Sequence, residues 1–167
     1  MAEIEVREAR RADAAALTDL LNAVIARGGT TALEDPYTPE RFAEAYIGGP
    51  DVHCCFVAVD PATGSFEGYQ SLGRSRDLPA DVGDIGTFAR LGGAQRGVGS
   101  ALFAATRARA AQLGLAAINA TIRADNAGGL AFYSKQGFRD HSVTPAVPLK
   151  NGSLVDRVNK RFALRPA

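Results

Sequence analysis

Four glycines gather in one short stretch of the chain, Gly92-Gly93-Ala94-Gln95-Arg96-Gly97-Val98-Gly99-Ser100. The residues before it read as a strand, and the alanine-rich run at 100–113 reads as a helix that stops at Gly114. The first turn of a helix has unpaired backbone N–H groups and a dipole that favours an anion. Because glycine permits positive φ angles and a close approach to the main chain, the stretch predicts a phosphate-binding turn.

Two common phosphate loops do not fit this stretch. A Walker A loop that began at Gly92 would have its second glycine at Gly97 and then a lysine, where the chain has Val98. A dinucleotide loop that began at Gly97 would need a small residue at Leu102, and no early βαβ unit precedes it. Nucleotide binding through either loop is therefore not expected.

The sequence before the glycine stretch predicts two helices among several strands. Apolar residues at three- and four-residue steps indicate a helix at 13–27, which Gly28 stops. Thr38 is placed to cap a short helix at 39–47. The segments expected to be extended are 4–7, 52–59, 66–72 and 84–90.

The sequence after the stretch continues the alternation of strands and helices. The expected elements are a strand at 115–122, a helix capped by Asp125 or Asn126 and ending at Gln136, an extended segment from Phe138, and a last strand at 154–164. No internal repeat or low-complexity linker is present. This order indicates a mixed sheet with helices on its faces, in a single domain that covers residues 1–167.

A second motif lies one predicted helix and one predicted strand after the glycine stretch. It reads Asn126-Ala127-Gly128-Gly129-Leu130-Ala131-Phe132-Tyr133-Ser134-Lys135-Gln136-Gly137-Phe138. With Ala94-Gln95-Arg96-Gly97-Val98-Gly99, it resembles the signatures Q/R-x-x-G-x-G/A and N-x-x-A-x-x-F-Y-x-K-x-G-F of the GNAT superfamily of acyl-CoA N-acyltransferases. The chain departs from them at Ala94, where a polar residue is usual, and at Gly129, where alanine or serine is usual.

The resemblance covers nearly the whole chain. It implies an α/β (α+β) fold with a mixed, mostly antiparallel central sheet of about seven strands flanked by about four helices. The strand Asp84-Ile85-Gly86-Thr87-Phe88-Ala89 looks most like the phosphinothricin acetyltransferase group, whose members acetylate free amino groups of small amino-acid-like compounds. The resemblance thus implies acetyl-CoA as the cosubstrate and no metal.

The resemblance also implies where acetyl-CoA binds. In this superfamily, main-chain amides of the glycine turn hold the pyrophosphate, and the central strand splays from its neighbour to pair with the pantetheine arm. The cofactor-binding residues implied here are Phe88, Ala89, Gln95, Arg96, Gly97, Val98, Gly99, Ser100, Asn126 and Tyr133. Asn126 could also cap the helix that begins there, and both roles can hold at once.

Asp84 is the candidate proton acceptor. Attack on a thioester needs a neutral amine, but an alkylamine is mostly protonated near neutral pH. Asp84 stands where the phosphinothricin-like enzymes carry an acidic residue, so it could take the proton directly or through a water. The alternative is a solvated carboxylate at a strand end.

Tyr133 is the candidate donor to the leaving group. The resemblance implies that its hydroxyl stabilises the departing thiolate of CoA. Composition alone also allows Phe132 and Tyr133 to be core aromatics, one of which shows its hydroxyl to solvent.

The acceptor pocket of the family is built by the first helix pair with nearby loops, here about 25–46, and by a C-terminal segment near 144–152. Glu34, Asp35 and Tyr37 could meet a cationic amine, although a plain acidic loop is the simpler interpretation.

Composition excludes several other classes of function. With 19 basic and 18 acidic residues the chain lacks a large basic field, so no nucleic-acid partner is expected. No apolar run approaches the roughly 20 residues of a membrane span, and residues 1–10 lack a signal sequence, so we expect a cytoplasmic protein without a membrane partner. Cys54 and Cys55 are adjacent, which predicts reduced core thiols; a Cys54 nucleophile with His141 has no supporting motif.

The leading hypothesis is an enzyme that transfers the acetyl group of acetyl-CoA to a primary amine of a small molecule, such as an amino acid or an analogue, directly in a ternary complex. A homodimer is the family-level expectation. The alternatives are a protein or peptide N-acetyltransferase and a non-catalytic acyl-CoA-binding sensor.

Overall fold

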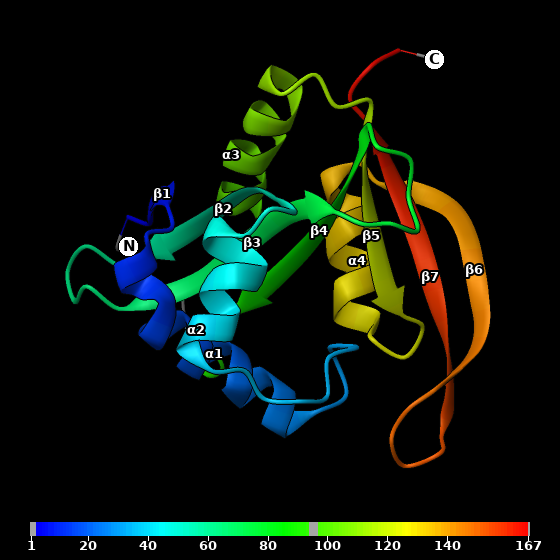
Figure 1. The fold of residues 1–167 in the computed structure, drawn as a ribbon, viewed down its shortest axis with the longest axis horizontal. Helices are drawn as coiled ribbons and strands as arrows, with labels where there is room; N and C mark the ends of the chain where they lie inside the picture. The colour runs from blue at the N-terminus through cyan, green and yellow to red at the C-terminus, as the bar shows by residue number, and fades with distance from the viewer. Residues whose placement is uncertain (1–2, 94–96, 167) are drawn as a thin grey trace.

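A computed structural model describes residues 3–93 and 97–166. In these residues, seven strands form one sheet in the order β1-β2-β3-β4-β5-β7-β6 (Figure 1). The pair β4–β5 is parallel and the other neighbours are antiparallel. The predicted mixed, mostly antiparallel sheet flanked by helices is therefore confirmed.

The elements before the glycine turn build the first half of the sheet and one helical layer. They are β1 (Glu5–Glu8), the 3-10 helix η1 (Arg11–Asp13), α1 (Ala14–Arg27), α2 (Pro39–Phe42), the π-helix η2 (Ala43–Gly48), β2 (Val52–Val59), β3 (Phe66–Arg74) and β4 (Val82–Ala89). The predicted helix at 39–47 forms, and the Thr38 hydroxyl accepts the N–H of Arg41 as its cap. Its second half widens into the π-helix, which the sequence pattern did not predict.

The elements after the turn build the second half. They are α3 (Val98–Gln112), β5 (Ala117–Arg123), α4 (Ala127–Gln136), β6 (Arg139–Pro148) and β7 (Leu154–Ala163). Helix α3 begins at Val98, two residues before the predicted start, because Gly97 takes a left-handed φ of 79° and turns the chain directly into the helix. Of the two predicted caps for α4, the structure uses Asn126.

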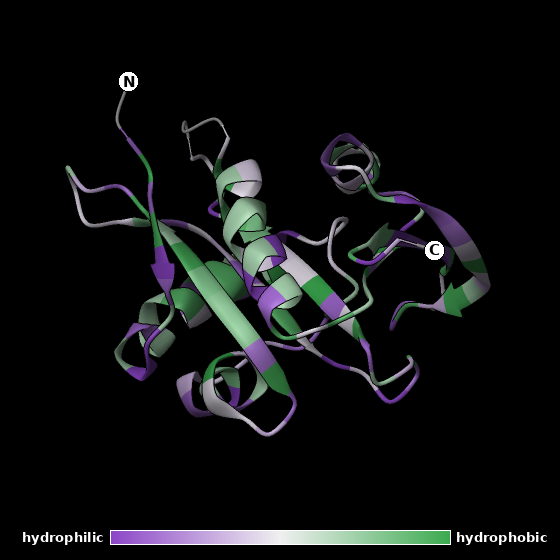
Figure 2. Ribbon diagram, turned by 90° about the horizontal axis from the view of Figure 1, so that it is seen from above, coloured by the Kyte–Doolittle hydropathy of each residue, from purple (hydrophilic) through white to green (hydrophobic). Residues whose placement is uncertain are grey.

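The sheet separates two hydrophobic cores. Along β2, Cys55 and Val57 point into the core formed with α1 and α2, whereas Cys54 and Phe56 point into the core formed with α3 and α4. Figure 2 shows the same layering from above, with hydrophobic residues along the central strands between helices. The two cysteines are buried and unpaired, as predicted.

Strands β4 and β5 separate part-way along their length. They pair from Val82 opposite Ala117 to Ile85 opposite Ala120, and the pairing then stops. From Gly86 to Ala89, β4 pairs only with β3, and from Thr121 to Arg123, β5 pairs only with β7. The predicted splay of the central strand is therefore present, and it opens the sheet beside α4.

Candidate active site

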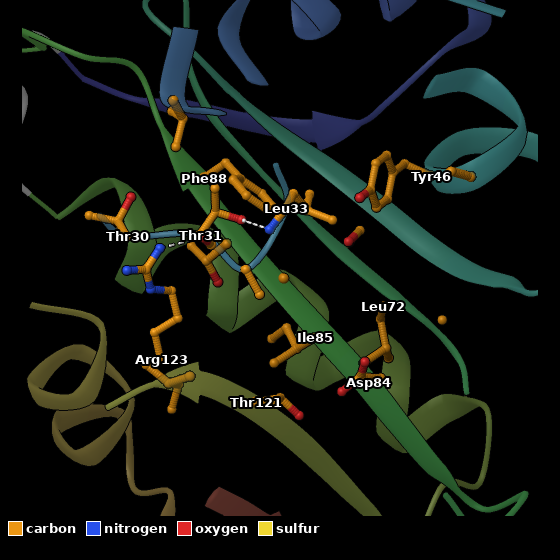
Figure 3. Close-up of a pocket in the computed structure, with 18 of the residues that line it drawn as sticks. Thr30, Thr31, Leu33, Tyr46, Leu72, Asp84, Ile85, Phe88, Thr121 and Arg123 are labelled. Atoms are coloured by element: carbon orange, nitrogen blue, oxygen red, sulfur yellow. Dashed lines mark hydrogen bonds between the residues drawn. The ribbon is translucent and has the colours of Figure 1, made fainter. Parts of the chain in front are cut away.

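A cavity of about 570 Å³ lies at the splay. Its walls come from β3, β4, β5, α4 and the loop after α1, and Figure 3 shows Asp84 and Phe88 on the same strand of its wall. The volume lies within the range of about 300–1,000 Å³ that small-molecule sites occupy. Asp84, Phe88, Ala89, Asn126 and Tyr133, all singled out from the sequence, line this one cavity.

Asp84 lies within β4, and its side chain is partly buried. Its Oδ1 accepts a hydrogen bond of 3.2 Å from Nδ2 of Asn119 on β5. Burial raises the pKa of Asp84 above its ordinary value, while the bond from Asn119 and the charge of Arg161 oppose that rise. A carboxylate in this setting is better suited to accept a proton than a fully solvated aspartate is.

Tyr133 projects from α4 and is 7% exposed. Its hydroxyl lies 2.8 Å from Oγ1 of Thr87 on β4, and that oxygen in turn accepts a bond of 2.9 Å from Gln70. Burial raises the pKa of Tyr133 to about 12, although the bond to Thr87 lowers it. The phenol therefore stays protonated at neutral pH and is available as a hydrogen-bond donor.

Asn126 caps α4 as predicted. Its Oδ1 accepts the N–H of Gly129 at 3.0 Å, and its Nδ2 donates to the carbonyl of Thr30 at 3.1 Å. A Cβ on Gly129 would lie 2.5 Å from Nδ2 of Asn126. This contact explains why glycine stands where alanine or serine is usual in the GNAT motif: Asn126 lies folded back over the first turn of the helix.

The described residues that lead from the glycine turn into α3 have different surroundings. Nothing lies within 4 Å of a Cβ built on Gly97, so that position is open, whereas a Cβ on Gly99 would lie 2.5 Å from the ring of Phe132. Gly99 therefore serves the packing of α3 against α4, which phosphate chemistry alone did not predict. Ser100 accepts a bond of 2.8 Å from Gln136.

The predicted cofactor residues Gln95 and Arg96, and the departure at Ala94, lie outside the described residues. Val98 is the first residue of α3, and its side chain is buried in the core with α3 and α4.

Phe88 and Ala89 line the cavity from the half of β4 that does not pair with β5. The Phe88 ring stacks on Tyr69, with centroids 5.0 Å apart and planes 19° apart. That stacking fixes the Phe88 side chain against β3. The main-chain edge of β4 that points toward β5 therefore faces the splay.

The loop after α1 meets the loop between β6 and β7. The Glu34 carboxylate accepts the N–H of Lys150, and the Lys150 ammonium pairs with Asp35. The two segments expected to form the acceptor pocket are thus brought together. These acidic groups are occupied by Lys150, in agreement with the simpler interpretation of a plain acidic loop.

Arg123 fixes the same loop from below and was not singled out from the sequence. It is 8% exposed, pairs with Asp125 through two bonds of 2.9 and 2.7 Å, and donates to the carbonyl of Thr31 at 3.2 Å (Figure 3). The sequence signal that could have identified Arg123 is its position at the end of the predicted strand, one residue after Ile122.

A Cys54–His141 pair does not form. Cys54 lies on β2 and His141 on β6, which are the second and the last strand in the sheet order. Burial raises the pKa of Cys54 to about 11, which leaves the thiol protonated and unreactive.

Within residues 3–93 and 97–166, no group of three or more His, Cys, Asp or Glu residues is arranged to hold a metal ion. In the same part of the chain, no helix has the length and apolar character needed to cross a membrane.

Known structures share this fold over almost the whole chain. A protein named as a phosphinothricin N-acetyltransferase is 25% identical, with 98% of this chain and 100% of that chain covered and a TM-score of 0.84. A GNAT superfamily phosphinothricin acetyltransferase from Sinorhizobium meliloti, solved in complex with AcCoA, is 21% identical over 98% of this chain and 89% of that chain, with a TM-score of 0.81. A ribosomal-protein-alanine N-acetyltransferase from Brucella melitensis is 21% identical over 95% and 99%, with a TM-score of 0.80.

No protein-family model and no curated protein matches the chain. The assignment therefore rests on the fold, on the splayed strands and on the described parts of the two motifs in their expected places. On this evidence the chain has the fold of the GNAT superfamily acetyltransferases.

Proposed function

We propose that this chain is an acetyl-CoA-dependent N-acetyltransferase that acetylates a primary amine of a small molecule, an amino acid or an amino-acid analogue. One observation carries the proposal: a carboxylate, Asp84, and a buried phenol, Tyr133, line one cavity at the splay between β4 and β5. A proton acceptor and a hydrogen-bond donor are the two groups that transfer from a thioester to an amine requires.

The described residues suit acetyl-CoA. Gly97 is open and left-handed at the start of a fifteen-residue helix, where an anionic pyrophosphate meets backbone N–H groups. The half of β4 that does not pair with β5 offers main-chain groups to an amide-containing arm, as a free sheet edge does. In the proposal, the side-chain amide of Asn126, at the N-terminus of α4, also bonds to the pantetheine arm.

Asp84 removes the proton that blocks the amine nitrogen. Among the described residues, only Oδ1 of Asp84 is hydrogen-bonded, so Oδ2 is the atom that accepts the proton, directly or through one water. Two protons leave the nitrogen in all: the one that blocks its lone pair passes to Asp84 and on to solvent before attack, and the second follows the same route as the C–N bond forms and the C–S bond breaks, while the electron pair of the C–S bond leaves on the CoA thiolate.

Tyr133 stabilises the sulfur as it leaves. Its pKa of about 12 lies well above that of an ordinary thiol, about 8.5, so the phenol keeps its proton and acts as a hydrogen-bond donor. Gln70 donates to Thr87, which leaves the Thr87 hydroxyl free to donate to Tyr133. Tyr133 then directs its own O–H into the cavity.

The acceptor class follows from the same cavity. Its apolar and aromatic lining includes Val24, Leu33, Tyr46 and Leu72, and Lys150 holds the loop after α1 in place. A largely apolar cavity of this volume suits a small amine better than an extended polymer. A single domain, a homodimer and a cytoplasmic location stay predictions.

The test is a thiol-release assay with acetyl-CoA against amino acids, simple amines and short peptides. The wild type is compared with Asp84→Asn and Tyr133→Phe, and with Asp51→Asn as a matched control on another acid that lines the cavity. We expect turnover of small amines, a loss of about 10²–10⁴-fold for Asp84→Asn, and little change for Asp51→Asn.

Three results would contradict the proposal in different ways. Turnover of peptides but not of free amines identifies a protein or peptide N-acetyltransferase. Binding of CoA, seen by calorimetry, without turnover of any amine identifies a sensor. Full activity of Asp84→Asn removes Asp84 from the mechanism.

A further inference from the structure

A fully buried amide lies in the middle of β5. Asn119 is 1% exposed and follows Ile118, which is also buried. Its Nδ2 donates to Oδ1 of Asp84 at 3.2 Å and to Oγ1 of Thr121 at 3.1 Å, and its Oδ1 accepts a bond of 2.8 Å from Nε of Arg161. A buried polar side chain is tolerated because all three bonds are made.

The chemistry of its neighbours fixes which way this amide points. A guanidinium only donates hydrogen bonds, and an ionised carboxylate only accepts them. With the amide reversed, the Asn119 oxygen would face Asp84 and its NH2 group would face Arg161, so both bonds would be lost. Asn119 therefore has one stable orientation between these two charges.

The three residues form a row across three strands. In the sheet register, Asp84 on β4 lies opposite Asn119 on β5, and Asn119 lies opposite Arg161 on β7. Residues paired in this way point to the same face of the sheet, and Asp84, at one end of the row, lines the cavity. The row is therefore fixed by the backbone pairing as well as by the side chains.

We infer that Asn119 and Arg161 are positioning residues for the proton acceptor, holding Oδ1 of Asp84 so that Oδ2 is left for the acceptor amine. The inference rests on the proposed function, since it gives Asp84 that role. Arg161 acts on Asp84 through Asn119, because its guanidinium bonds to the amide and not to the carboxylate.

The electrostatic setting of Asp84 agrees with this geometry. Burial and the nearby charge of Asp77 raise the pKa of Asp84, whereas the Asn119 bond and the Arg161 charge lower it. Tyr133 is the other titratable group coupled to Asp84, and Asp51, Arg74 and Arg123 are the remaining charged residues along the cavity. Without the row, the pKa of Asp84 would rise further, and a smaller fraction of its carboxyl groups would be ionised and able to accept a proton.

The first test measures Asp84 itself and does not depend on turnover. Protein labelled with ¹³C at the aspartate carboxyl carbon is titrated by NMR, and the Asp84 signal is assigned by its absence in Asp84→Asn. We expect Arg161→Met to raise the measured pKa of Asp84 and Arg161→Lys, which keeps the charge, to raise it less. Arg27→Met removes an exposed arginine at the end of α1 and should leave that pKa unchanged.

A double-mutant cycle tests the route through the amide. If Arg161 acts through Asn119, the pKa change of the double variant Asn119→Ala, Arg161→Met falls short of the sum of the single changes. Additive changes would mean that Arg161 acts through space alone and would overturn the inferred route. Thermal melts of each variant separate these effects from loss of folding.

Kinetics then separate this inference from the proposed function. With any amine that the wild type acetylates, Arg161→Met should move the acid limb of the kcat/KM profile to higher pH, whereas loss of stability alone lowers the profile without moving it. If Asp84→Asn abolishes turnover but Arg161→Met moves neither the titration nor the acid limb, the inference fails and the proposed function stands. If Asp84→Asn keeps full turnover, the proposed role of Asp84 fails, and the titration still reports whether the row holds its carboxylate.

Discussion

Replacing Gly99 by alanine should loosen the contact between α3 and α4. The new Cβ would lie 2.5 and 2.9 Å from two carbons of the Phe132 ring, whereas ordinary carbon contacts are about 3.5–4.0 Å, so the ring must move by about 1 Å. Forcing an extra methyl group into a packed site costs about 1–3 kcal/mol, while alanine in place of glycine in a helix returns at most about 1 kcal/mol. Because Phe132 is only partly buried and can turn outward, we expect a net loss of about 1 kcal/mol.

That loss corresponds to a fall of about 2–4 °C in Tm for a chain of this size, which calorimetry or urea unfolding can measure. The matched control is Gly128→Ala, since Gly128 is likewise the second residue of its helix but has no atom closer than 3.9 Å to the added Cβ. This control should be unchanged or slightly more stable. In a Phe132→Leu background the cost of Gly99→Ala should shrink. A Gly99→Ala variant that melts at or above the wild type, or as high as Gly128→Ala, would refute the packing role of Gly99.

Three further predictions follow from the site. Asp84→Asn should raise Tm at pH 7. Because the native pKa of Asp84 is raised, the wild type loses stability as the pH rises through that pKa, and the asparagine variant does not. The Tm values of the two proteins, measured from pH 3 to 8, should therefore converge at the acid end, and a Tm difference that stays constant with pH would contradict the prediction. Thr87→Val should cost about 1–3 kcal/mol, since it removes the partner of Tyr133 and of Gln70, and Thr87→Ser should restore most of it in the same urea titration. Cys54 and Cys55, with pKa values raised by burial to about 11 and about 12, should react with a thiol reagent at pH 8 only after unfolding; fast labelling of the native protein would argue against their burial.

The sequence predicted the elements well where local signals set their limits. Thr38 and Pro39 marked the start of α2, and Gly137 marked the end of α4 with a left-handed φ of 104°. The π-helical continuation of α2 was missed because the apolar pattern and the end glycines of a π-helical turn look like those of an α-helix. A Cβ on Gly49 would lie only 1.8 Å from the Glu44 carbonyl five residues earlier, so the end of the wide turn requires glycine, which was interpreted only as a helix stop.

The residues of the candidate site likewise divide into those that a local sequence signal marks and those that only the fold brings together. Asp84, Tyr133 and Asn126 were found through motifs that are contiguous in sequence. Their partners Asn119, Arg161 and Thr87 were missed because hydrogen bonds between strands join residues that are far apart along the chain: Tyr133 is 46 positions from Thr87, and Arg161 is 42 positions from Asn119. Strand register, which supplies these pairs, requires the sheet order, and the insertion of β7 between β5 and β6 is not written in any local pattern.

The splay between β4 and β5 has a consequence for how the protein can change over generations of mutation. The free edge from Gly86 to Ala89 presents the main chain, which every amino acid except proline reproduces. A substitution here that keeps the strand in place therefore leaves unchanged what the edge offers to a partner, although Thr87 and Phe88 have side-chain contacts of their own to keep. A lineage could retune the rest of the cavity for a new amine while this edge is inherited unchanged.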